Sequence, residues 1–190
     1  MMQTESRTNI GSPQHEAQTD DHELSWYALR VFHNKSSVIC AQADKDGVEW
    51  YTPIREEEYF DKEGIHIRHL HLMPSLLFLH CTKKYIERIE QLTYGNIRPY
   101  CEPGSRVPQA IDEKQMQMFI FVARTAIREA EIVDYEPKRG ERVRITGGIF
   151  NGAIGEIRRI HGTRRFVVSV EGVTAIATSY IPRQYIEPIE

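Results

Sequence analysis

The chain has 190 residues, and its 24 lysine and arginine side chains against 27 acidic ones give a formal charge of −3. With 41% hydrophobic and 27% charged residues, its composition is that of an ordinary soluble protein. These figures exclude a membrane protein and a mainly disordered one. The near-neutral charge also argues against a protein that coats nucleic acid by charge alone.

The charges are distributed unevenly along the chain. Residues 1–24 hold one arginine against five acidic residues, and their polar composition predicts a disordered tail. Residues 138–190 hold nine basic residues against five acidic ones, whereas residues 25–137 hold 14 against 17. The net charge is therefore a cancellation between a basic C-terminal module and acidic neighbours. No segment reads as a secretion signal or membrane span, which predicts a cytoplasmic protein.

The residues that commonly bind metals or act in catalysis do not form a recognisable set. The cysteines are odd in number and form no CxxC pair: Cys40, Cys81 and Cys101. Four histidines lie close in sequence, namely His66, His69, His71 and His80. Only His69 and His71 would share a face of a strand, and no carboxylate or thiol completes a usual ligand set. We expect no metal, no cofactor and no enzymatic activity, because a phosphate loop and a nucleophile with a recognisable partner are also missing.

The first two thirds of the chain alternate strand and helix signals. Aromatic, β-branched and apolar runs predict strands over residues 26–31, 48–55, 64–72, 76–79 and 97–101. The residues between the second and third of these, at 61–64, have the composition of a hairpin turn. The continuous apolar run at 76–79 suits a central strand covered on both faces.

Helices are predicted over residues 36–46, 82–91 and 112–129 from capping residues and apolar spacing. Asn34 or Ser36 is the expected cap of the first helix, which Gly47 ends, while Thr82 and Asp112 cap the other two. This order of elements predicts an α+β sandwich. We expect a tail over 1–24, the sandwich domain over 25–129, a linker over 130–138 and a second domain over 139–190.

The second domain differs in kind. Short β-branched runs at 142–145, 155–160, 165–170 and 174–178 alternate with glycine-containing turns, which predicts a small closed all-β barrel. The most specific stretch is 140–157, whose glycines fit positions of positive φ or close backbone approach. Within it, Phe150 is expected to plug the barrel.

The stretch 140–157 resembles the KOW motif of NusG-type transcription factors. Upstream, residues 26–31, 48–54 and 72–79 resemble strands of the NusG N-terminal domain in order and spacing, so the resemblance runs from Trp26 to Ile189. Within the family, residues 142–150 and 170–173 are most similar to the UpxY antiterminators of capsular polysaccharide operons. The resemblance implies an N-terminal NusG (NGN) α/β sandwich with an antiparallel sheet, followed by an SH3-like KOW barrel.

The resemblance also implies a function and partners. Such a factor, expected as a monomer, binds the clamp helices of the RNA polymerase largest subunit and lies over upstream and non-template DNA. It suppresses pausing and termination, here at one operon. Two alternatives remain open: a general NusG-type factor, and a KOW protein that binds RNA or the ribosome in translation.

The resemblance assigns two groups of residues, and the charge of the second domain indicates a third. For polymerase binding, it points to Tyr27, Tyr51, Pro53, Met73, Pro74, Leu76 and Arg88. For nucleic acid, it points to Arg30, His33, Asn34 and Lys35. The bland alternatives are core residues for the first group and a solvated loop for the second.

The third group is the partner surface of the KOW domain, with a solvated face of mixed ion pairs as the bland alternative. Its members are Arg158, Arg159, Arg164, Arg165 and Val173. The turn at 171–174 is small and aliphatic where general NusG proteins often carry an aromatic residue, which predicts no stimulation of the Rho factor. The density of valine, isoleucine and turn glycines favours a barrel over a helical hairpin for this domain.

Overall fold

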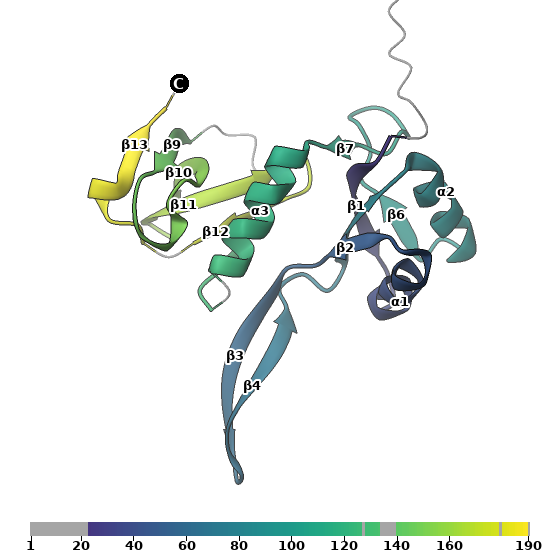
Figure 1. Ribbon diagram of the computed structural model, residues 1–190, viewed down its shortest axis with the longest axis horizontal. Coiled ribbons are helices and arrows are strands. Elements are labelled where there is room, and N and C mark those ends of the chain that lie inside the picture. Colours follow the sequence, from purple (N-terminus) through teal and green to yellow (C-terminus); the bar gives the residue numbers. More distant parts are fainter. Residues whose placement is uncertain (1–22, 127, 134–139, 179, 190) are drawn as a thin grey trace, which may run out of the picture.

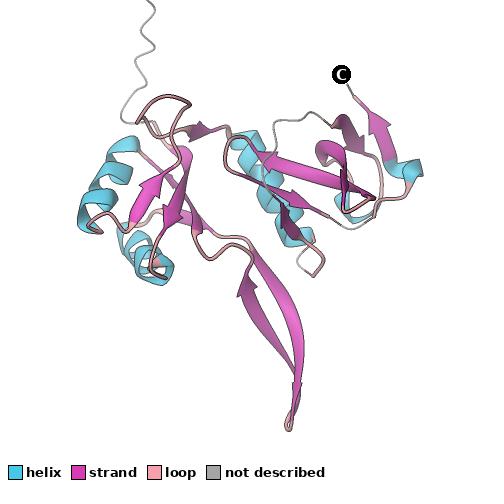
Figure 2. Ribbon diagram, turned by 180° about the vertical axis from the view of Figure 1, so that it is seen from behind, coloured by secondary structure: helices cyan, strands magenta, loops and turns pink. Residues whose placement is uncertain are grey.

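The computed structural model describes residues 23–126, 128–133, 140–178 and 180–189 (Figures 1 and 2). Its α-helices are α1 (Ser36–Asp46), α2 (Lys83–Leu92) and α3 (Glu113–Thr125). The rest is built from antiparallel strands in two sheets and one separate hairpin. The predicted fold class is confirmed: a mixed α/β domain is followed by a β-rich domain. No helix in the described ranges is long and apolar enough to cross a membrane.

The first sheet has the strand order β2-β5-β1-β6, with β7 also paired to β1. Its strands are β1 (Ser25–Val31), β2 (Glu49–Tyr51), β5 (Leu76–Cys81), β6 (Ile97–Pro99) and β7 (Ala110–Ile111). The apolar run at 76–79 is confirmed as an inner strand, since β5 lies between β2 and β1 and is buried on both faces.

Alternation along the strands gives this sheet two apolar faces. On one face, Trp26 and Phe78 pack with residues of α3. On the other face, Tyr27, Leu29 and Leu79 pack with residues of α1 and α2. Because successive strand residues point to opposite sides, neighbours in sequence such as Trp26 and Tyr27 belong to different cores.

The capping predictions are confirmed at three positions. Thr82 and Asp112 accept hydrogen bonds from backbone N–H groups in the first turns of α2 and α3. Gly47 ends α1 in the left-handed region, at φ 68°. The predicted cap of α1 is wrong: Lys35 occupies the position without a side-chain hydrogen bond, and the Ser36 hydroxyl instead donates to the Pro74 carbonyl at 2.8 Å.

Two predicted element boundaries are also wrong. The strand expected over 48–55 breaks at Pro53, because proline has no N–H for the ladder, and its carbonyl accepts from the Leu72 N–H at 2.9 Å. The helix expected to reach residue 129 ends at Thr125, and the Glu129 and Ala130 N–H groups both turn back to the Ala126 carbonyl. This turn returns the chain toward the second sheet.

Beyond Pro53 the chain leaves the first sheet as a long hairpin. Its strands are β3 (Ile54–Asp61) and β4 (Gly64–His71), paired from Ile54–His71 to Asp61–Gly64. The predicted turn at 61–64 is confirmed. In Figures 1 and 2 the hairpin projects away from both domains, and β3 and β4 pair only with each other.

The second sheet has six antiparallel strands in the order β13-β9-β10-β11-β12-β8. They are β8 (Glu131–Val133), β9 (Glu141–Ile145), β10 (Ile154–Ile160), β11 (Thr163–Val170), β12 (Thr174–Ala177) and β13 (Ile186–Pro188), with the 3₁₀ turns η1 (Gly148–Phe150) and η2 (Arg183–Tyr185). Among the described residues the pairing does not close into a ring. The expected all-β second domain is therefore confirmed, while closure of the barrel stays a prediction. In the described pairing β13 and β8 are the end strands, and Pro188 suits such a position.

The expected linker is corrected as well. Its residues Glu131–Val133 form β8, which pairs with β12 and so belongs to the second sheet. Residues 134–139 of the linker lie outside the described ranges, as does most of the predicted tail. β8 follows directly on the turn at Ala126 and therefore holds the second sheet close to α3.

Helix α3 joins the two domains. One side of it packs on the first sheet, and another contacts β11, β12 and η1 of the second (Figure 1). A single apolar cluster consequently runs from Trp26 through Phe119 to Phe150 and Phe166. Phe150 is buried in it, as expected of the residue that plugs the second domain.

The glycine prediction for residues 140–157 is confirmed in both of its forms. Gly148 and Gly152 have positive φ, whereas Gly155 permits a close approach. A Cβ on Gly155 would lie 2.5 Å from the Val167 carbonyl oxygen and 2.7 Å from the Phe166 ring.

We expect Gly155→Ala to lower the free energy of unfolding by about 1–3 kcal/mol, because the clash is with backbone and a buried ring. Chemical denaturation measures this loss. Arg159→Ala, at an exposed position on the same strand, is the control and should change stability by less than about 0.5 kcal/mol. Equal effects of the two substitutions would contradict the close-approach explanation.

Candidate functional site

Five of the seven predicted polymerase-binding residues gather where the first sheet meets the hairpin. Tyr51 ends β2, Pro53 precedes β3, and Met73 and Leu76 follow β4 on the return to the sheet. Tyr51 and Leu76 belong to the cluster beneath α3, and Met73 packs against it while remaining half-buried. Pro74, which follows Met73, is exposed at the surface.

Tyr51 is a buried residue and presents little surface to a partner. It is 8% exposed, with its ring 6.3 Å from Phe78 and 6.4 Å from Phe119 between centroids. Burial raises the pKa of its hydroxyl to about 12, against the effect of the nearby Arg124 cation. The Arg124 guanidinium lies 5.7 Å from the ring centroid. Tyr51 thus lies beneath a surface formed by Met73, Pro74 and Arg124, which we call the strip.

The two remaining predicted residues lie elsewhere. Tyr27 is 5% exposed and packs in the core on the α1 and α2 side of the sheet, opposite Tyr51. Arg88 is on α2, where its guanidinium lies 3.9 Å from the Asp46 carboxylate and 5.9 Å from the Tyr85 ring centroid. The structure therefore does not bring Tyr27 or Arg88 together with the strip.

Asp46 links α1 to α2 at the position that Arg88 approaches. Its carboxylate accepts hydrogen bonds from the Gln42 amide at 3.1 Å and the Tyr85 hydroxyl at 3.0 Å. These two hydrogen bonds lower the pKa of Asp46, and the Arg88 cation acts in the same direction. The polar contacts of Arg88 are thus explained by helix packing.

The predicted nucleic-acid residues form one continuous edge. Arg30 lies near the end of β1 with its side chain exposed, and His33, Asn34 and Lys35 follow in the turn before α1. His33 and Asn34 both have positive φ, at 55° and 54°. Such strained backbone is characteristic of functional sites, and here the turn is fixed by a 3.0 Å hydrogen bond between His33 Nδ1 and Asn96 Oδ1.

The structure adds two residues that the sequence did not indicate. Arg98 on β6 is the cross-strand partner of Arg30, so the two exposed cations lie side by side on one face of the sheet. Tyr94 is 94% exposed in the turn after α2, which contacts the His33 turn through the Phe32 N–H bond to the Asn96 carbonyl. An aromatic residue beside turn glycine at 94–95 was the available sequence signal for Tyr94. Arg98 required the long-range register.

The predicted arginines of the second domain do not form a single surface. Arg158 pairs with Arg165 across β10 and β11, and Arg159 pairs with Arg164 on the opposite face. Three of them are in ion pairs: Arg158 with Glu156 at 2.7 Å, Arg164 with Glu141 at 3.2 Å, and Arg165 with Glu131 at 2.5 Å. Val173 lies in the β11–β12 turn and packs against the shared apolar cluster.

The same turn contacts the first domain. The Glu171 N–H donates to the Gln115 side chain on α3, and the Gln109 amide donates to the Glu171 carbonyl, both at 3.4 Å. Val173 is therefore at the boundary between the domains in this structure.

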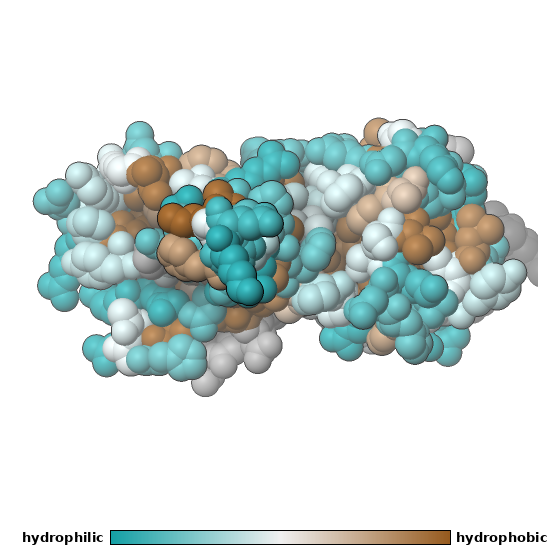
Figure 3. Space-filling view, turned by 90° about the horizontal axis from the view of Figure 1, so that it is seen from below, coloured by the Kyte–Doolittle hydropathy of each residue, from teal (hydrophilic) through white to brown (hydrophobic). Residues whose placement is uncertain are grey.

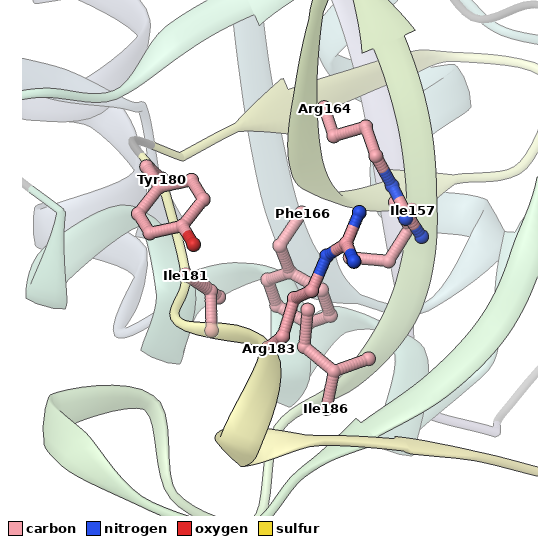
Figure 4. A pocket seen from close by; sticks show the side chains of 7 residues that line it. All are labelled: Ile157, Arg164, Phe166, Tyr180, Ile181, Arg183 and Ile186. Atoms are coloured by element: carbon pink, nitrogen blue, oxygen red, sulfur yellow. The ribbon is translucent and has the colours of Figure 1, made fainter.

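A shallow pocket lies on the second domain near Arg164 (Figure 4). Its lining residues are Ile157, Arg164, Phe166, Tyr180, Ile181, Arg183 and Ile186. In Figure 4 the side chains of Arg164 and Arg183 join the apolar and aromatic residues that line it. Arg183 was not among the predicted partner residues, although its charge is available to the same surface.

The histidine-rich segment is held by its own hairpin. His66 lies 3.0 Å from the Asp61 carboxylate and His69 lies 3.4 Å from that of Glu56. Within the described part of the chain, no three or more histidine, cysteine, aspartate or glutamate side chains are grouped so that they could hold a metal ion.

The thiols differ in accessibility. Burial raises the pKa of Cys81 to about 12 and that of Cys40 to about 11, and it also raises the pKa of the half-buried Cys101. We expect iodoacetamide to label Cys101 first in the native protein, because thiolate content and access decide the rate. Peptide mass spectrometry after timed labelling measures the order, and equal labelling of the three would contradict it.

Comparison with known proteins identifies a family for this chain. The chain matches a family model, NusG, described as "Transcription termination factor nusG", over residues 24–120, half of the chain. A solved structure from Thermotoga maritima, "Domain interaction in Thermotoga maritima NusG", is similar with a TM-score of 0.46 and 16% identity, covering 88% of this chain and 98% of that chain. A comparison with curated proteins returned no match.

The match to the family model spans the first sheet, the hairpin, α1, α2 and the first half of α3. NusG proteins are non-catalytic factors that bind RNA polymerase and act in transcription elongation or antitermination. Because the family model matches half of the chain, the chain belongs to the NusG family.

Proposed function

We propose that this chain is an operon-specific antiterminator of the UpxY type, acting on a capsular polysaccharide operon. Its N-terminal unit, residues 25–129, binds RNA polymerase, and residues 139–190 form a KOW unit. The observation that best supports specialisation is the pair of Arg30 and Arg98, together with Tyr94 in the turn that contacts the His33 turn. These residues combine two exposed cations with an aromatic ring that is 94% exposed, which is the chemistry that single-stranded nucleic acid binds.

The polymerase contact is proposed at the strip of Met73, Pro74 and Arg124. It is formed by a methionine, a proline and an arginine over a rigid aromatic support, a composition suited to a protein interface. In this proposal the strip meets the clamp helices of the largest polymerase subunit. A contact that exists only when the clamp is closed biases the polymerase toward that state by its own free energy, which disfavours pausing.

The nucleic-acid edge is proposed to meet the non-template strand. Arg30 and Arg98 would neutralise phosphates, and Tyr94 would stack on a base. The polar groups of His33 and Asn34 are held in a fixed turn and would contribute the contacts that depend on sequence. Binding at this edge would recruit the factor to one leader.

A second candidate is a KOW protein that binds RNA or the ribosome through its second domain. The pocket with Arg164 and Arg183 favours a role for this domain in partner binding. The ion pairs of Arg158 and Arg165 disfavour a broad cationic surface, since their charge is already neutralised within the domain.

Reporters downstream of different leaders test the proposal. With a terminator placed after its own operon's leader, the chain should raise readthrough and co-purify with RNA polymerase. With unrelated leaders it should leave readthrough unchanged. Equal readthrough on all leaders would indicate a general NusG-type factor instead. Ribosome association without polymerase association would favour the second candidate.

A further inference from the structure

We propose that the tip of the β3–β4 hairpin is a second protein-docking site, whose partner is a polymerase surface with an apolar centre and a basic rim. This inference rests on the proposed function and adds a second contact with polymerase to it. The residues concerned are Phe60, Ile65 and Ile67, which we call the apolar tip. They are 75%, 65% and 56% exposed, respectively.

The apolar tip lies on one face of the hairpin. In the register of β3 and β4, Phe60 pairs with Ile65 and Glu58 with Ile67, and alternate pairs share a face. The three apolar side chains are therefore cross-strand or diagonal neighbours. Figure 3 looks from below onto the hairpin and shows brown side chains on one side of its tip and teal ones on the other.

The opposite face already satisfies its polar groups. Arg68 donates to the Glu57 carboxylate at 2.8 Å and lies 5.6 Å from the Tyr59 ring centroid. The Tyr59 ring stacks on His66 at 5.4 Å between centroids, and His66 lies 3.0 Å from Asp61. This chain of contacts along one face stabilises a two-stranded ribbon that on its own would be only marginally stable in water.

The charge of the hairpin indicates the kind of partner. Residues 54–71 carry three basic side chains against five carboxylates. Phosphate groups would be repelled, so nucleic acid does not fit the tip. On the side of the apolar tip, Glu58 lies across from Ile67 and Glu63 lies in the turn, and both are exposed. A protein surface with lysine or arginine side chains around an apolar centre complements this arrangement.

The position of the hairpin also favours a polymerase surface. Its base at Ile54 and His71 adjoins the strip of Met73 and Pro74, and eight-residue strands reach roughly 25 Å from it. The apolar tip shares its face with Glu58, which lies 3.2 Å from Arg128 just beyond α3. A polymerase bound at the strip would thus have the hairpin extending along its surface.

Affinity measurements test the proposed contact of the apolar tip with polymerase. We expect a triple variant, Phe60→Thr, Ile65→Thr and Ile67→Thr, to bind purified core RNA polymerase about tenfold or more weakly than the wild type. Threonine keeps strand propensity, and none of the three residues belongs to a buried core. A matched variant, Ile65→Val with Ile67→Val, keeps the tip apolar and should bind within about threefold of wild type.

Photocrosslinking identifies the partner. A photoreactive phenylalanine in place of Phe60 should crosslink to a polymerase subunit in an elongation complex, whereas the same group in place of Tyr59, on the opposite face, should crosslink far less. Crosslinks from position 60 to DNA or to a second copy of this chain would overturn the proposal. So would wild-type affinity of the triple threonine variant. If the wild type binds polymerase and the triple variant binds equally well, only the hairpin proposal fails. If the wild type itself does not bind polymerase, the proposed function fails as well.

Discussion

Phe119→Ala is expected to lower the free energy of unfolding by about 3–5 kcal/mol. Phe119 is fully buried on α3, with its ring 5.5 Å from Phe78 and 6.4 Å from Tyr51 between centroids. The substitution leaves a cavity in the cluster that joins the first sheet, α3 and the second domain. We therefore expect both domains to lose stability together. Denaturation followed by near-ultraviolet circular dichroism and by tryptophan fluorescence measures the loss.

The matched control is Phe121→Ala on the same helix. Phe121 is 40% exposed, so its truncation removes less buried area and should cost less than about 1.5 kcal/mol. Similar losses for the two variants would show that α3 is not embedded as described. Two separate transitions, only one of them shifted by Phe119→Ala, would show that the domains unfold independently.

The apolar cluster that the two domains share is the part of the fold that the sequence did not predict. Local signals identify the elements well: capping by Thr82 and Asp112, the left-handed Gly47 and the turn at 61–64 all appear as expected. These features depend on residues a few positions apart. The pairing of β8 with β12 depends on residues more than forty positions apart, and a three-residue strand carries too weak a pattern to predict.

The candidate site follows the same division. Position along the chain correctly groups Arg30 with the turn at 33–35, because these residues are consecutive or nearly so. It does not separate Tyr27 from Tyr51, since the two faces of the sheet differ only in which helices cover them. Arg98 is brought beside Arg30 by the β1–β6 register, which no local pattern specifies. Strand alternation could have placed Arg158 and Arg159 on opposite faces, but it could not have shown that Glu156 forms an ion pair with Arg158.

The pairing of Arg30 with Arg98 leads to the strongest functional prediction. Two cations held side by side on a rigid sheet attract phosphate more than either alone, and the Arg30 guanidinium is positioned 5.8 Å from the Tyr100 ring centroid. We expect Arg30→Ala with Arg98→Ala to weaken binding to an elongation complex on the recognised leader by about tenfold or more at low salt. Losing two phosphate contacts on a single strand should also reduce the slope of log affinity against log salt by about 1.4.

Tyr94 should contribute through its ring alone. Tyr94→Ala is expected to weaken the same binding by about 1–3 kcal/mol, whereas Tyr94→Phe should keep most of it, because stacking does not need the hydroxyl. Fluorescence anisotropy at several salt concentrations measures all of these variants. Arg144→Ala with Arg159→Ala removes two exposed cations from the second domain and serves as the charge-matched control. If it reduced affinity and salt slope as much as the loss of Arg30 and Arg98, general charge rather than this edge would carry the interaction. An unchanged salt slope in the double variant would show that the two arginines do not contact phosphate.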